Sequence, residues 1–293
     1  MSLPVILEVA ANGITTRAQN PAVPREPKEL AEDALACFAA GASIVHTHPH
    51  ELVQPPAACA ALYLEAYRPV LAKKPGALLY PTVSPGRTIE ERYGHTTHLA
   101  EARAIRMGAL DTGSVNIGGT QADGWPTPMD YVYTNSPNDI RYMAEVCRRH
   151  WLGPSVAVFE PGFLRVVLAA EKHGVLPPGT FVKLYFSAGG YLGGGEPCFG
   201  APPIREALDM YLAMLRGSKL PWAVAVIGGS LLDSEIARPA LERGGHLRVG
   251  LEDFFTAKSN VDEVRRAAAL AKEAGRALAS CAEAEAILGL PRA

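Results

Sequence analysis

The chain has 293 residues, 48% of them hydrophobic and 20% charged, which is enough apolar material for a sizeable core and excludes a disordered protein. A formal net charge of −2, without a block of like charges, argues against a nucleic-acid partner. No apolar stretch approaches the roughly 18 residues of a membrane span, no signal-peptide pattern is found, and the cysteines are scattered. We therefore expect a cytoplasmic protein that does not bind a membrane.

Short apolar runs alternate with amphipathic segments along the whole chain. Such a run, bounded by turn residues, is typical of a buried strand, whereas an apolar stripe with a period near 3.6 is typical of a helix. The expected strands are Val5–Ala11, Ser43–Thr47, Ala77–Val83, Ala109–Val115, Ser155–Phe159, Phe181–Phe186, Trp222–Ile227 and His246–Leu251. The helices are expected near residues 27–40, 55–72, 88–106, 136–150, 162–174, 203–217, 231–243 and 260–274.

This alternation of strand and helix predicts the fold. Eight repeats over this length favour a (β/α)8 TIM barrel over an open doubly wound sheet. No linker-like stretch divides the chain, so residues 1–293 are expected to form a single barrel domain with a short C-terminal helical extension. The spacing of Asn260 and Glu263 predicts a capping box at the start of the eighth helix, and Ser280 with Glu283 predicts the terminal helix.

The loops after the strands are the expected location of the active site. In a (β/α)8 barrel this site lies at the carboxyl ends of the strands, so polar and glycine residues there are candidates for substrate contacts. These candidates are Asn12, Thr82, Ser84, Ser114, Asn116, Gly189 and Gly190. The glycine-rich loop after the sixth strand lacks the Lys-Ser/Thr ending of a P-loop. Two uses remain open for it, a backbone contact to a phosphate or thioester oxygen and a mobile lid.

Two histidines separated by one residue end the second expected strand. Because side chains two residues apart in a strand point to the same side, His46 and His48 can bind one metal ion. His50 is a rival ligand in the following loop. A catalytic zinc often binds two histidines and one glutamate and keeps its fourth position open, and Glu252 at the end of the eighth strand supplies the carboxylate. The sequence thus predicts a zinc site between the second and last strands.

The end of the eighth strand also carries Arg248 and Asp253 beside Glu252. One interpretation is a structural ion-pair network that ties the strand to its helix. The other is a catalytic pair next to the metal. In the second case Asp253 is the better candidate for a general base, because a guanidinium stays protonated and is suited to clamp a carboxylate with two hydrogen bonds.

Taken together and in this order, the motifs resemble the β-keto acid cleavage enzymes, a family of zinc-dependent (β/α)8 barrels. The resemblance spans essentially the whole chain. It depends on the His-x-His after the second strand, the Arg-x-Gly-x-Glu-Asp segment ending the eighth, the Asn12-Gly13 turn before Thr15-Thr16-Arg17, and Trp222-Ala-Val-Ala.

The resemblance implies a reaction and a set of partners. The reaction is a condensation of a β-keto acid with acetyl-CoA, which yields acetoacetate and a new acyl-CoA. Zinc would be held by His46, His48 and Glu252. The family also implies a homo-oligomer, expected to be a tetramer.

Further residues acquire roles by the same resemblance. Arg248 and Asp253 would form the catalytic pair, and Glu160 would be an additional active-site acid. Ser114 matches a hydroxyl residue in the turn after the fourth strand.

The pattern departs from the family in the loop after the first strand. Members that cleave the aminohexanoate substrate have a glutamate there, which meets the ammonium group, whereas this chain has Ile14 at or near that position. We therefore expect a substrate with a neutral or apolar tail. Glu8 is an alternative countercharge or a structural residue. Thr82 and Ser84 are both candidates for the family's hydroxyl after the third strand.

Two other functions compete with this one. The first is a metal-dependent C–C lyase or hydrolase on a barrel that uses no CoA. The second is a non-catalytic barrel that retains zinc and binds a ligand.

Overall fold

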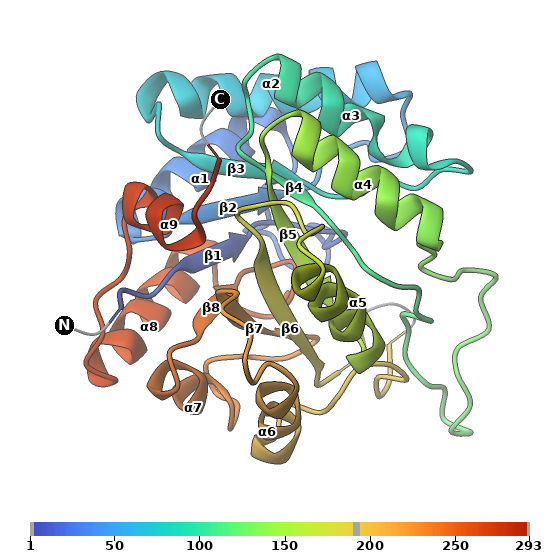
Figure 1. Cartoon of the computed structure of the whole chain (residues 1–293), viewed down its shortest axis with the longest axis vertical. Helices are drawn as coiled ribbons and strands as arrows, with labels where there is room; N and C mark the ends of the chain where they lie inside the picture. The colour runs from blue at the N-terminus through green and yellow to red at the C-terminus, as the bar shows by residue number, and fades with distance from the viewer. Residues whose placement is uncertain (1–2, 190–193, 292–293) are drawn as a thin grey trace.

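A ring of parallel strands surrounded by helices forms the body of the protein (Figure 1). The computed structural model describes residues 3–189 and 194–291. The strands are β1 Leu7–Ala10, β2 Ile44–Thr47, β3 Leu78–Pro81, β4 Met107–Ala109, β5 Gly153–Val158, β6 Phe181–Ser187, β7 Trp222–Ile227 and β8 His246–Val249. The helices of this part of the chain are α1 Pro27–Ala40, α2 Pro56–Lys73, α3 Ile89–Glu101, α4 Pro137–Arg149, α5 Pro161–Lys172, α6 Arg205–Met214, α7 Ala237–Glu242, α8 Asn260–Glu273 and α9 Cys281–Leu288.

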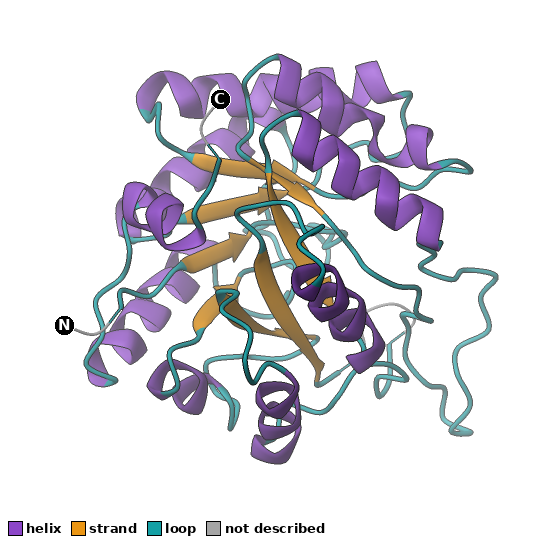
Figure 2. Cartoon of the chain, in the orientation of Figure 1, coloured by secondary structure: helices purple, strands orange, loops and turns teal. Residues whose placement is uncertain are grey.

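The order of the strands confirms the predicted (β/α)8 barrel. Hydrogen bonds join them as β3-β2-β1-β8-β7-β6-β5-β4, and all the pairs are parallel. The two ends of this order, β3 and β4, lie next to one another and bring the ring nearly to closure. Figure 2 shows the strands in the middle and the helices around them. The carboxyl ends of all eight strands therefore meet on one face.

The fourth strand is shorter than predicted and lies earlier in the chain. The sequence predicts Ala109–Val115, but β4 covers Met107–Ala109. Beyond it, Asp111 accepts a hydrogen bond from the Ala157 backbone N–H (3.3 Å), and Thr112 donates one to the Phe163 carbonyl (3.0 Å). Because these residues bond to β5 and α5 through their side chains, the backbone beyond Ala109 leaves the strand pairing, and the rest of the expected strand Ala109–Val115 forms a loop.

Two helix predictions also need correction. The seventh helix is expected over residues 231–243, but α7 covers only Ala237–Glu242. The residues before it form a turn, in which the Ser234 N–H donates a hydrogen bond to the Leu231 carbonyl. The eighth helix is capped by Ser259, not by Asn260. The Asn260 side chain accepts from the Leu251 N–H (2.9 Å) and donates to the Ala11 carbonyl (2.8 Å), so it links two strand-end loops instead.

The C-terminal helix is as predicted. Ser280 and Glu283 form a capping box at the start of α9. The helix is attached to the barrel by an ion pair between Arg106 and Glu285 (3.2 Å). Across the described part of the chain, every helix is too short or too polar to span a bilayer.

A half-buried acid of α1, Asp33, makes stability depend on pH. The Asp33 carboxylate accepts a hydrogen bond from Asn260 Nδ2 (2.8 Å), and burial raises the pKa of Asp33 to about 6. When the pKa of a carboxyl group is higher in the folded protein than in the unfolded chain, the folded protein loses stability as the pH rises from the unfolded-state pKa to the folded-state pKa. We expect Asp33→Asn to be more stable than the parent by about 1–2 kcal/mol at pH 7 and by much less at pH 4. Urea unfolding at both pH values measures this difference, and an equal difference at both would contradict it.

Candidate functional site

A cavity of about 840 Å³ opens at the carboxyl ends of the strands. Its strand-borne wall is polar. The residues of this wall include His46, Tyr80, Ser155, Lys183, Tyr185 and Arg248. The loops add an apolar rim with Ile14, Leu52, Met129 and Val132. A polar interior with an apolar entrance suits a small molecule that carries both a charged and an apolar end.

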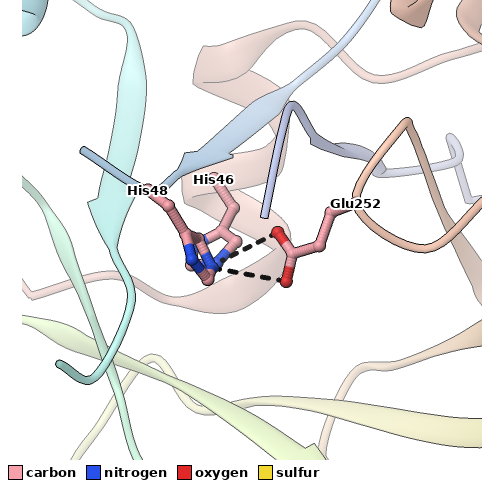
Figure 3. Close-up of side chains that lie close together, drawn as sticks. All are labelled: His46, His48 and Glu252. Carbon is pink, nitrogen blue, oxygen red and sulfur yellow. Dashed lines mark ion pairs between the residues drawn. The ribbon is translucent and has the colours of Figure 1, made fainter. Parts of the chain in front are cut away.

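The predicted metal ligands converge on one point of this cavity. His46 at the end of β2, His48 one residue beyond it and Glu252 after β8 each offer an atom within 4.8 Å of the others. Figure 3 shows the two imidazoles facing the carboxylate. His46 Nε2 lies 3.5 Å from one carboxylate oxygen, and His48 Nε2 lies 3.5 Å from the other. His50 is not part of this group of described residues.

The chemistry of this cluster fits a divalent cation. Both ring nitrogens of His48 and Glu252 Oε2 are buried without a hydrogen-bond partner in the described structure, which is costly unless a ligand is bound. Burial lowers the pKa of His46, so its imidazole is neutral, as metal binding requires. His46 Nδ1 lies 3.2 Å from the Tyr80 carbonyl, which suits an N–H there and leaves Nε2 as the ligand atom. Three protein ligands leave room for a substrate atom.

The Glu252 carboxylate is negative, as a ligand should be. Burial by itself raises the pKa of Glu252, but the neighbouring His48 and Arg248 outweigh it and hold that pKa well below its usual value. Arg248 Nη2 lies 3.0 Å from Glu252 Oε1.

Two neighbouring loops hold the ligands in place. Asn12 Nδ2 donates to the His48 carbonyl, and Asn12 Oδ1 accepts from the His48 N–H, both at 2.9 Å. Gly13 has a φ of +50°, and a Cβ there would overlap the Glu252 side chain. Gly250 has a φ of +134°, and a Cβ there would overlap the Ala10 carbonyl. Glycine is therefore required at both positions by backbone conformation and by space.

Arg248 and Asp253 form a direct pair beside the metal cluster. Arg248 Nε donates to Asp253 Oδ2 (2.8 Å), and Nη2 lies 3.3 Å from Oδ1. Burial raises the pKa of Asp253 to about 6, and the adjacent Glu252 adds to this rise, while Arg248 opposes it. Asp253 is thus a buried carboxylate with a guanidinium partner on the cavity wall, the arrangement of an oriented base.

A second charged group lies deeper in the barrel, formed by Glu8, Tyr80, Lys183 and Arg248 and here called the floor cluster. Glu8 Oε1 accepts from Tyr80 Oη (2.5 Å), Lys183 Nζ (3.2 Å) and Arg248 Nη1 (2.7 Å). Burial by itself raises the pKa of Glu8, but the positive charges of Lys183 and Arg248 lower this pKa by more than burial raises it, so Glu8 is ionised. Glu8 thus lies within the floor cluster, away from the apolar rim.

Sequence reasoning missed Tyr80 and Lys183 as site residues. Lys183 is the one charged residue of the run Phe181–Ser187, and it pairs in register with Ala157 and Ala223, whose small side chains leave it space. A lone lysine in a buried strand was the available signal, because an inward charge must be paired.

A further pair lies where β4 ends, formed by the strand-end acid Asp111, which the sequence places at this face of the barrel, and by Tyr133, which sequence reasoning missed. Asp111 lines the cavity and accepts a hydrogen bond from the Tyr133 hydroxyl, which comes from the long loop before α4. Burial raises the pKa of Asp111. The hydrogen bond between Asp111 and Tyr133 therefore holds the loop before α4 against the cavity.

The remaining predicted residues occupy different places. Thr82 and Ser84 both line the cavity, so the choice between them stays open. Ser114 and Asn116 are exposed, and Ser114 Oγ accepts from the Asn135 N–H (2.8 Å). Asn12 lies behind His48. Glu160 caps α5 and accepts from the Gly200 N–H (2.9 Å), Gly189 packs against Gly228, and Gly190 lies outside the described residues. Their binding roles stay predictions.

Comparisons with known proteins agree with this geometry. A model of the β-keto acid cleavage enzyme family matches residues 4–290. The chain is 28% identical to 3-keto-5-aminohexanoate cleavage enzyme of Fusobacterium nucleatum, over 98% of both chains. It is 30% identical to 3-oxoadipate:acetyl-CoA acetyltransferase of Cupriavidus necator, over 99% of this chain and 96% of the relative. A solved binary complex of ObcA with oxaloacetate has the same fold, with a TM-score of 0.68 and 16% identity over 93% of this chain and 68% of that one.

Proposed function

Because this chain belongs to the β-keto acid cleavage enzyme family, we propose that it transfers an acyl group between a β-keto acid and acetyl-CoA. The products would be acetoacetate and a new acyl-CoA. The observation that supports this most directly is the cluster of His46, His48 and Glu252 on the wall of a cavity of about 840 Å³, next to the Arg248–Asp253 pair.

We propose that His46, His48 and Glu252 hold zinc, which two histidines and one carboxylate suit. When bound, a divalent cation supplies positive charge to a substrate oxygen that becomes negative during the reaction. The neutral imidazole of His46, the ionised carboxylate of Glu252 and the buried nitrogens of His48, which have no hydrogen-bond partner among the described residues, support this assignment.

The protein groups next to this site supply the proton chemistry. Asp253 is proposed to take the proton from the carbon between the carboxylate and the ketone of the β-keto acid. Arg248 orients Asp253 through two nitrogens. The resulting enolate carbon attacks the thioester carbonyl of acetyl-CoA and releases the CoA thiolate. The thiolate then attacks the original ketone carbon, and cleavage of the carbon–carbon bond releases acyl-CoA and the carbanion of acetoacetate. Asp253 returns its proton to this carbanion, which gives acetoacetate.

An assay with and without acetyl-CoA separates the candidate functions. We expect acetoacetate to form only when both acetyl-CoA and a β-keto acid are present. A CoA-independent lyase would consume the keto acid without acetyl-CoA, and a hydrolase would likewise need no CoA. A binding protein would consume nothing. Any of these three outcomes would reject the proposed reaction.

We propose a substrate with a neutral or apolar tail. Ile14 lines the rim and is 41% exposed, and Arg25 Nη1 donates to the adjacent Gly13 carbonyl (3.0 Å), so Ile14 and these two described neighbours offer no anion to an ammonium group. The carboxylate of Asp130, which also lines the cavity, comes from the loop before α4. We expect kcat/KM for 3-oxohexanoate to exceed that for 3-keto-5-aminohexanoate, which has the same carbon chain, by about tenfold or more. Ile14→Glu should narrow this ratio. Equal rates for both substrates in the parent would contradict the assignment.

The organisation of the protein is also part of the proposal. We propose a single barrel domain with α9 as its extension, assembled into a homo-oligomer in the cytoplasm. The Arg106–Glu285 ion pair and the bridge between Val5 and Leu278 support α9 as an integral part of the domain. Light scattering of the purified protein measures the number of subunits.

A further inference from the structure

The Lys183 ammonium lies at the bottom of the cavity with one of its hydrogen-bond donors unused. It is 3% exposed and donates to Tyr80 Oη (2.6 Å) and Glu8 Oε1 (3.2 Å). An ammonium has three donors, and the described residues provide no third acceptor for it. The nearby carboxyls of Asp111 and Asp253 are engaged by Tyr133 and by Arg248. Lys183 can therefore accommodate one additional oxygen.

The Ser155 hydroxyl provides a second unused group in the same region. Ser155 is on β5, is 1% exposed and lines the cavity. Its oxygen lies beside the Tyr80 hydroxyl but makes no hydrogen bond of normal geometry to the described residues. Lys183 pairs in register with Ala157, and Ser155 lies two residues before Ala157 on the same strand. Because side chains two residues apart point to the same side of a strand, the side chains of Ser155 and Lys183 both project into the barrel from neighbouring strands. Leaving a buried hydroxyl unpaired is unfavourable, which indicates that a ligand satisfies it.

These groups lie close to the metal cluster. The Tyr80 ring, whose hydroxyl contacts Lys183, lies 4.4 Å from the His46 ring, centroid to centroid. A small molecule in the cavity can thus contact the metal cluster and Lys183 together. The apolar rim with Met129 and Val132, which are 40% and 51% exposed, lies at the other end.

We propose that Lys183 and Ser155 form a binding subsite for the carboxylate of the β-keto acid, so that the keto oxygen faces the metal cluster and the tail points to the apolar rim. This inference rests on the proposed function, because it takes the β-keto acid as the ligand. A carboxylate is favoured over an uncharged oxygen because it accepts both a charged and a neutral donor, and charge-assisted hydrogen bonds are the stronger ones. The subsite also gives a function to the buried charge of Lys183, whose carboxylate partner Glu8 is shared with Arg248.

Binding of a matched ligand pair tests the subsite. Acetoacetate has the carboxylate, whereas methyl acetoacetate has the same skeleton without the charge. Calorimetry on the metal-loaded protein is expected to give tighter binding of acetoacetate. In Lys183→Met, the affinity for acetoacetate should fall about tenfold to a hundredfold, while that for methyl acetoacetate changes less than about threefold. Lys219→Met, at an exposed lysine, should bind both ligands like the parent.

Ser155→Ala keeps the test valid if Lys183→Met does not fold, because it removes one hydroxyl and no charge. We expect a loss of about threefold to tenfold in Ser155→Ala, again for acetoacetate and not for the ester. Equal losses for both ligands would assign a purely structural role to Lys183 and would overturn the inference. So would unchanged affinities, or a parent that does not bind acetoacetate. A parent that binds acetoacetate selectively but forms none from acetyl-CoA would reject the proposed reaction and leave the subsite standing.

Discussion

Replacing His48 with Gln is expected to remove both the metal and the activity. Both ring nitrogens of His48 are buried and have no hydrogen-bond partner in residues 3–189 and 194–291, and Asn12 fixes its backbone through two hydrogen bonds, so metal binding is the role that remains for the ring. Loss of one of three ligands should reduce the metal content from one ion per chain to nearly none. Acetoacetate formation should fall by about 10³-fold or more, because several kcal/mol of charge stabilisation are lost. Metal analysis of the purified variant and the acetoacetate assay measure the two effects.

His50 offers a matched control two residues further on. Its imidazole lies outside the metal cluster, so His50→Gln should keep both metal and activity. Chelation of the parent followed by readdition of Zn²⁺, Mn²⁺ or Mg²⁺ identifies the ion, and we expect Zn²⁺ to restore activity best. If His48→Gln retained stoichiometric metal, or if the chelated enzyme were fully active, the proposed site would be wrong.

Replacing Asp253 with Asn is expected to reduce turnover while the metal stays bound. The amide has nearly the size of the carboxylate and can still accept a hydrogen bond from Arg248, but it cannot take a proton. A general base contributes about 10²-fold to 10⁴-fold to a rate, so kcat should fall by that factor. The metal content should equal that of the parent, because Asp253 is not part of the ligand cluster.

The control for this substitution is Asp209→Asn. Asp209 is a surface residue of α6 in an ion pair with Arg243, so its loss should leave kcat unchanged. An Asp253→Asn enzyme with the kcat of the parent would exclude Asp253 as the base. A variant that also lost its metal would point to a supporting role for Asp253 around Glu252.

The two patterns that predicted the fold are local ones. A strand repeats its side-chain direction every two residues and a helix every 3.6, so both are visible in a single sequence. The boundaries were less predictable. Asp111 and Asn260 each bond to residues outside their own element, Ala157 for the first and Leu251 and Ala11 for the second. The bond of Asp111 lies just beyond the end of β4, and the bonds of Asn260 leave Ser259 as the N-cap of α8.

The sequence by itself determined the barrel and the trio His46, His48 and Glu252, because spacing within one strand and position at a strand end follow from the local pattern alone. Only the tertiary structure decided that Glu8, Tyr80, Lys183 and Arg248 form one cluster and that Ser155 lies beside it. These residues come from five strands, β1, β3, β5, β6 and β8. The physical reason is that closing a barrel brings inward side chains of distant strands into contact, and a buried charge is stable only beside a partner that the local sequence does not contain.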